Sequence, residues 1–193
     1  RGAVGADPLA GDGAGILIQI PNEFFKTQLL RKKISLPPIG EYAVGMIFFP
    51  KDVERKKKLL KIIEDVISDE GQELICWRDV PVNSSVLGET VKSNEPCIKQ
   101  VFIKMGGKIS SEIEFERKLY IIRKLITSYL DSQSKSFDEF YISSLSIRTI
   151  VYKGMVLAPN LSKYYLDFQD KSFKSAMAMF HQRFSTNTFL LGN

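Results

Sequence analysis

The sequence predicts an α+β fold built as a layered sandwich. Apolar runs of strand length interleave with amphipathic helical segments, and several predicted strands follow one another with no helix between them. A doubly wound sheet would need a helix after almost every strand, so the neighbouring strands favour packed layers instead. With 193 residues, 44% of them hydrophobic and 25% charged, the chain can bury a sizeable core.

The first half of the chain predicts a glycine-rich loop over residues 1–13, followed by three strands and two helices. The strands are expected at residues 14–20, 43–49 and 73–80. Pro21 begins the first helix, which runs to about Lys32. The second helix, residues 52–68, is amphipathic because the following apolar residues recur at helical spacing: Leu59, Ile63, Val66 and Ile67.

The second half begins with a strand at 98–105 and then the longest predicted helix. Ser111 and Glu114 form a capping-box pattern, and Glu114 with Lys118 is an expected i,i+4 ion pair. The apolar face of this helix is predicted to comprise Phe115, Leu119, Ile122, Ile126 and Tyr129.

After the polar loop at 132–138, two strands are expected at 140–145 and 147–152, adjacent in one sheet. Residues 157–170 predict short helical turns, and the apolar run at 176–180 predicts a buried strand that leads into the closing segment 181–189.

Composition argues against several classes of function. Cys76 and Cys97 are far apart, and with a single histidine the chain offers no zinc ligand set, so no metal site is expected. The net charge of +5 comes from scattered lysines, whereas nucleic-acid binding favours a basic stripe with stacking aromatics. No apolar run approaches the roughly 20 residues that a membrane helix requires.

The segment 181–189 contains the strongest local signal for a binding site. Arg183 precedes Thr186 by three residues, and such a pair suits a small carboxylate, because the guanidinium donates two parallel hydrogen bonds and the hydroxyl completes the site. An ordinary polar loop with a surface arginine is the alternative. His181 beside it is expected to be structural, since no acid–base partner is apparent.

Five stretches together resemble one family. They are residues 1–16, 36–46, 77–82, 148–155 and 181–189. The first resembles the segment that follows the nucleophile in class II glutamine amidotransferases, and the set is similar, more narrowly, to the large chains of glutamate synthases. The resemblance extends from residue 1 to about residue 189. It implies that residues 1–193 are part of a single amidotransferase domain, an incomplete four-layer αββα sandwich of the N-terminal-nucleophile hydrolase type.

The resemblance also implies the chemistry. Family members use an N-terminal cysteine to attack the side-chain amide of glutamine and release ammonia, which a separate region uses with FMN and an iron–sulfur cluster to convert 2-oxoglutarate to glutamate. By resemblance, Arg183 binds the α-carboxylate of glutamine, Thr186 supports it, and Arg1 packs near the nucleophile. The nucleophilic cysteine would lie before residue 1, so no catalytic residue and no cofactor is expected within the segment itself.

The expected partners of the full-length protein are glutamine, the synthase domains of the same chain and an electron donor. The donor is ferredoxin, which the resemblance favours, or an NAD(P)H-oxidising subunit. A non-catalytic module of the same fold is the alternative function. The Lys- and Ile-rich composition favours a plastid location, with a bacterial cytoplasm as the alternative.

Overall fold

The computed structural model describes residues 13–133 and 139–182. Within them the strands are β1 (Ala14–Gln19), β2 (Tyr42–Phe49), β3 (Glu73–Asp79), β4 (Cys97–Lys104), β5 (Tyr141–Ser146), β6 (Thr149–Gly154) and β7 (Ala178–His181). The helices are α1 (Asn22–Leu30), α2 (Val53–Asp69), α3 (Glu89–Ser93), α4 (Glu112–Ser132) and α5 (Leu161–Tyr164). Short 3₁₀ segments lie at Ser84–Val86, Ala158–Asn160 and Leu166–Gln169.

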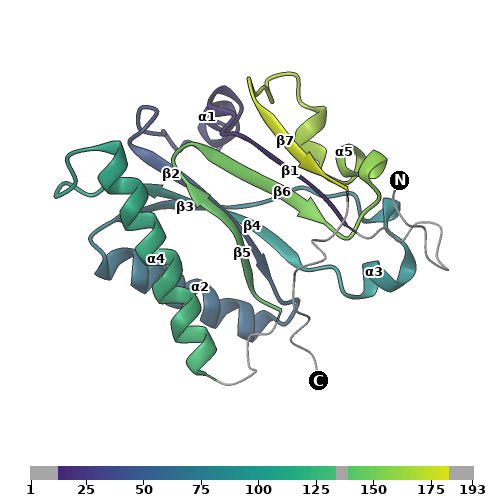
Figure 1. Cartoon of the computed structure of the whole chain (residues 1–193), viewed down its shortest axis with the longest axis horizontal. Helices are drawn as coiled ribbons and strands as arrows, with labels where there is room; N and C mark the ends of the chain where they lie inside the picture. The colour runs from purple at the N-terminus through teal and green to yellow at the C-terminus, as the bar shows by residue number, and fades with distance from the viewer. Residues whose placement is uncertain (1–12, 134–138, 183–193) are drawn as a thin grey trace.

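The strands form two antiparallel sheets, one in the order β6-β1-β7 and one in the order β3-β4-β2-β5. Figure 1 shows α2 and α4 side by side over one face of the four-stranded sheet, with the three-stranded sheet beyond it. The core between the sheets includes Val44, Met46, Phe102, Ile150 and Tyr152. The core under the two helices includes Ala43, Ile47, Leu59, Phe115 and Leu119.

This order of one helical layer followed by two packed sheets confirms the predicted α+β layering, and it is compatible with the αββα sandwich. The strand β2 explains how the layers are joined. Its alternate residues enter the two cores in turn, so that all eight residues except Phe48 are buried. An uninterrupted apolar run is what a strand covered on both faces requires, and the expectation for 43–49 is therefore confirmed.

The two long helices begin where capping side chains satisfy their first backbone N–H groups. Asp52 Oδ1 accepts from the N–H of Arg55 at 2.7 Å, and Ser111 Oγ accepts from the N–H of Glu114 at 3.3 Å. The capping box is modified, because the carboxylate of Glu114 accepts from the N–H of Ser110 instead of the N–H of Ser111. The starts of both predicted helices are thus confirmed to within a residue or two.

Two details of the prediction for α4 are wrong. Tyr129 is exposed, and the buried face continues through Leu130 instead. The helix has 3.6 residues per turn, so an apolar stripe that begins at Phe115 and continues in steps of three or four residues can end at Tyr129 or at Leu130. Lys118 does not pair with Glu114; its ammonium contacts Glu70 at 2.8 Å, at the C-cap of α2, and so joins the two helices.

The prediction that the strands now seen as β5 and β6 are neighbours in one sheet is also wrong. β5 pairs with β2 in one sheet, while β6 pairs with β1 in the other. The chain changes sheets at Ser146, whose hydroxyl accepts from the N–H groups of Arg148 and Thr149. From the helical layer, Glu116 accepts from the Ser146 hydroxyl and from the N–H of Ile147. These side chains satisfy backbone groups that a continuous ladder would otherwise pair.

No helix among the described residues combines the length and the apolar character needed to cross a membrane.

Candidate functional site

The outer strand β7 brings the two ends of the described chain together. β7 runs antiparallel to β1, and the register pairs Gly15 with His181 and Ile18 with Ala178. The start of β1 and the end of β7 therefore meet at one end of the three-stranded sheet (Figure 1). Arg1, Arg183 and Thr186, the residues predicted to bind substrate, lie outside the described residues.

A cleft of about 480 Å³ opens beside these two chain ends. We call it the β1–β7 cleft, and it is lined by Ala14, Gly15, Ile16, Ala158, Pro159, Leu161, Ser162, Phe168, Phe180, His181 and Gln182. Apart from His181 no lining residue can carry a charge, so the described part of the cleft gives shape and apolar contact. A charged substrate group would need partners from elsewhere in the chain.

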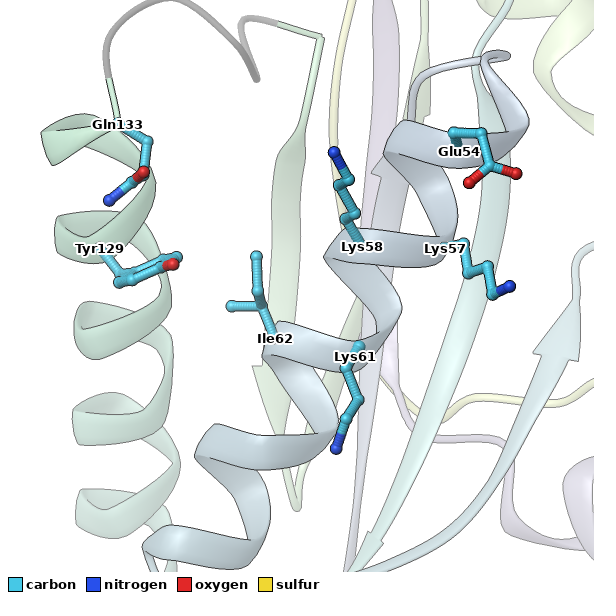
Figure 2. A pocket seen from close by; sticks show the side chains of 7 residues that line it. All are labelled: Glu54, Lys57, Lys58, Lys61, Ile62, Tyr129 and Gln133. Carbon is cyan, nitrogen blue, oxygen red and sulfur yellow. The ribbon is translucent and has the colours of Figure 1, made fainter.

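A second hollow, of about 620 Å³, lies between α2 and α4, but its lining makes it a weaker candidate. Figure 2 shows its lining: Glu54, Lys57, Lys58, Lys61, Ile62, Tyr129 and Gln133. The three lysines are exposed side chains on one helix, and Lys61 is already paired with Asp65 of the next turn at 2.5 Å. A row of exposed lysines is typical of a solvated helix face.

The expectation that His181 follows a buried strand is wrong, because all four residues of β7 are exposed. β7 is the edge strand of the three-stranded sheet within the described residues, and only β1 pairs with it there. The imidazole of His181 lies against Gly15, where an added Cβ would come within 2.5 Å of Nε2. This close packing supports the structural role that was predicted for His181.

Replacement of Gly15 by alanine is expected to lower the free energy of unfolding by about 1–3 kcal/mol, because the new methyl group would also come within 2.8 Å of Lys153 Cβ. Thermal unfolding measures the loss as a lower midpoint. Gly107→Ala is the matched control, since an added Cβ there meets nothing within 4 Å. Equal midpoints for the two variants would show that the close packing of Gly15 and His181 does not matter for stability.

The wall of the cleft is attached to the core through a buried polar network. Arg78 on β3 donates from Nη2 to Asp167 Oδ1 at 2.6 Å and from Nη1 to Asp167 Oδ2 at 2.9 Å. Nη1 also donates to Gln100 Oε1 at 2.8 Å. Tyr152 on β6 donates to Asp167 Oδ2 and accepts from Gln100 Nε2, each at 2.9 Å. We call these four residues the Arg78 network.

The environment of the Arg78 network keeps the Tyr152 hydroxyl protonated. Burial raises the pKa of Tyr152 well above its ordinary value, and the negative charge of Asp167 raises it further. Tyr152 therefore remains a neutral phenol that can donate to the carboxylate. The side chains of Arg78 and Asp167 are only 7% and 2% exposed. Removal of either one would therefore leave the other as a buried charge without a counter-ion.

Sequence reasoning missed this network. One residue in the sequence could have indicated the network. Gln100 lies two residues from both Ile98 and Phe102, and it therefore occupies an inward position of β4. A glutamine at an inward position requires a polar partner in the core. The partners of Gln100 are Arg78, 22 residues away, and Tyr152, 52 residues away. Arg78 in turn pairs with Asp167 across 89 residues, and no local pattern indicates such pairings.

The two cysteines lie on opposite faces of the four-stranded sheet. Cys76 packs against the core between the sheets, whereas Cys97 packs against the core under α2 and α4. Burial raises the pKa of the Cys76 thiol, so it is not activated as a nucleophile. Both residues are partly buried and pack as small apolar side chains against the cores.

The fold and the sequence together define the class of protein. The model of class II glutamine amidotransferases matches residues 1–190, and the chain belongs to this family.

Among its relatives are glutamate synthases. The chain is 43% identical over 189 residues to the glutamate synthase [NADPH] large chain of Bacillus subtilis, which covers 98% of this chain. It is 40% identical over 188 residues, 97% of the chain, to the chloroplastic ferredoxin-dependent glutamate synthase of Oryza sativa. It is 41% identical over 189 residues, again 97%, to the ferredoxin-dependent glutamate synthase of Pyropia yezoensis. The chain spans about 12% of the length of each of these relatives.

Proposed function

We propose that this chain is part of the glutaminase domain of a glutamate synthase large chain, and that it takes part in hydrolysis of glutamine to glutamate and ammonia. The observation that carries the proposal is identity of 40–43% across almost the whole chain to glutamate synthases that use different electron donors. Residues 1–193 would then form one part of a single amidotransferase domain.

In this proposal Arg183 and Thr186 bind the α-carboxylate of glutamine, and Arg1 supports the segment near the nucleophile. The geometry of the described residues supports this placement. Gln182 lines the β1–β7 cleft and directly precedes Arg183, while the chain that follows Arg1 enters the fold at the start of β1, beside the same cleft. The nucleophilic cysteine would precede residue 1, where an adjacent amine could accept its proton.

The ammonia would serve reductive amination of 2-oxoglutarate elsewhere in the full-length protein, with FMN and an iron–sulfur cluster. The cysteines of this chain do not fit such a cluster, since Cys76 and Cys97 face opposite sides of one sheet and cluster ligation takes several convergent thiolates. Relatives with either donor are about equally similar, so ferredoxin and an NAD(P)H-oxidising subunit both stay as proposed partners. A plastid is the proposed location, with a bacterial cytoplasm as the alternative.

Release of ammonia from glutamine tests the proposal. We expect the full-length protein to release ammonia, and replacement of its cysteine nucleophile to abolish the release. The isolated 193 residues should be inactive, because neither internal cysteine can take over the chemistry. Activity of the isolated segment would contradict the placement of the nucleophile, and an inactive full-length protein would favour the non-catalytic module.

A further inference from the structure

The first half of α2 carries more positive charge than a helix favours at that position. Arg55 and Lys56 lie in its first turn, where the helix dipole favours anions, and Lys57 and Lys58 follow directly. Lys61 lies one turn after Lys57, and like charges at this spacing repel each other. These cations weaken α2 as a helix, so their concentration here indicates a partner of opposite charge.

Two lysines of the hollow between α2 and α4 have no counter-ion of their own. Lys57 and Lys58 both line the hollow, and within residues 13–133 and 139–182 neither forms an ion pair. Lys61, the third lysine of the lining, already pairs with Asp65. The unpaired positive charge of the hollow is therefore concentrated at Lys57 and Lys58.

An exposed apolar row lies beside these lysines. Ile121, Leu125 and Tyr129 are spaced by four residues along one side of α4, and they are 41%, 43% and 48% exposed. Figure 2 shows Tyr129 and Ile62 of α2 pointing toward each other across the space between the helices. We call the hollow and this row together the α2–α4 groove. Several large apolar side chains exposed on one surface are typical of an interaction site.

The groove fits an acidic protein helix better than it fits other anionic partners. An amphipathic helix laid along a groove presents apolar side chains at every third or fourth position, and its carboxylates can reach Lys57 and Lys58. A nucleic acid or an anionic membrane would instead meet Glu54 in the same lining and Asp65 on the same helix, and both carboxylates repel a polyanion.

We propose that the α2–α4 groove binds an acidic, amphipathic helix from the synthase region of the same full-length protein. This inference rests on the proposed function, and it adds a surface through which the glutaminase region contacts the rest of the polypeptide. The chain spans about 12% of the length of its relatives, so most of the full-length protein would lie outside residues 1–193. A segment tethered to the groove binds at a higher effective concentration than a separate protein does.

Labelling of lysines in the full-length protein tests whether the groove is covered. We expect the docked state to be populated above about 90%, so that acetylation of Lys57 and Lys58 is about tenfold slower than that of Lys26 and Lys108, which are exposed elsewhere. Carbodiimide cross-linking should join Lys57 or Lys58 to a carboxylate outside residues 1–193. A mixture of isotope-labelled and unlabelled protein shows whether the link lies within one polypeptide.

Replacement of Leu125 by glutamine probes the apolar row without changing the lysines. We expect this variant to release the docked helix, so that Lys57 and Lys58 are acetylated at the rate of Lys26. Tyr120→Gln is the matched control, because Tyr120 is 61% exposed on the same helix but outside the row. This control should keep the slow rate of the wild type.

Acetylation of Lys57 and Lys58 at the control rate in the wild type would show a solvated helix face and overturn the inference. Cross-links between two copies, or protection that appears only with added DNA or anionic vesicles, would overturn it by indicating a different occupant. Failure of the proposed function has a separate readout, because the full-length protein would then release no ammonia from glutamine, whatever the labelling rates.

Discussion

Replacement of Arg183 by alanine in the full-length protein is expected to lower kcat/KM for glutamine by roughly 30-fold or more, mainly through KM. The proposed contact joins a guanidinium to a desolvated carboxylate, and loss of one partner of such a pair costs about 2–5 kcal/mol. Steady-state ammonia release at increasing glutamine concentration measures the change. Glutamine analogues that lack the α-carboxylate should lose affinity for the wild-type protein but show little further loss with the variant.

Arg148→Ala is a suitable control for this experiment. Arg148 is an exposed arginine that contacts Glu112 at 3.4 Å, at the turn between β5 and β6, and its removal should leave KM unchanged. Unchanged KM and kcat in Arg183→Ala would contradict the assignment of Arg183. A fall in kcat alone would instead indicate that Arg183 acts on the reacting amide and not on the carboxylate.

The second large effect is expected on stability. Arg78→Met should reduce the free energy of unfolding by about 3–5 kcal/mol, because it leaves the carboxylate of Asp167 buried without a counter-ion. That is a large share of the roughly 5–15 kcal/mol by which a typical domain is stable. Urea denaturation measures the loss as a lower midpoint with a similar slope.

Removal of an exposed cation from the same sheet gives the comparison. Lys104→Met breaks a pair whose side chains are 45% and 59% exposed, so the change should remain within about 0.5 kcal/mol of wild type. Similar midpoints for Arg78→Met and Lys104→Met would mean that the buried pair of Arg78 contributes no more to stability than the exposed pair of Lys104.

Local patterns in the sequence were sufficient to predict most helices and strands. β2 was predicted from an unbroken apolar run and the starts of α2 and α4 from capping residues, because these signals lie within a few residues of the element they define. Tyr129 shows the limit of such patterns. Its apolar character fits the stripe, but the geometry of packing against α2 and the sheet selects Leu130.

The arrangement of β5 and β6 could not be predicted in the same way. Two strands separated by a short turn usually pair with each other, and nothing in their own residues shows otherwise. The turn at Ser146 is held by Glu116 from α4, and the serine hydroxyls of β5 contact the backbone of β6 where a ladder would have been. The Glu116 contact spans 30 residues, so the short segment from β5 to β6 does not reveal it.

For the candidate site, too, the sequence supplied one part and the structure another. The substrate-binding assignments for Arg183, Thr186 and Arg1 came from family resemblance, and all three residues lie outside the described ranges, so they stay predictions. The described residues add what the sequence could not supply. The register of β1 with β7 brings the first and last described residues to one cleft, and Asp167 links the cleft wall to the opposite sheet.

A structure of the full-length protein with glutamine bound, its cysteine nucleophile replaced by alanine, tests the central claim most directly. The account predicts that glutamine lies in the β1–β7 cleft, with both α-carboxylate oxygens about 2.7–2.9 Å from the guanidinium nitrogens of Arg183. Glutamine bound elsewhere, or bound in this cleft with its carboxylate held by other residues, would contradict it.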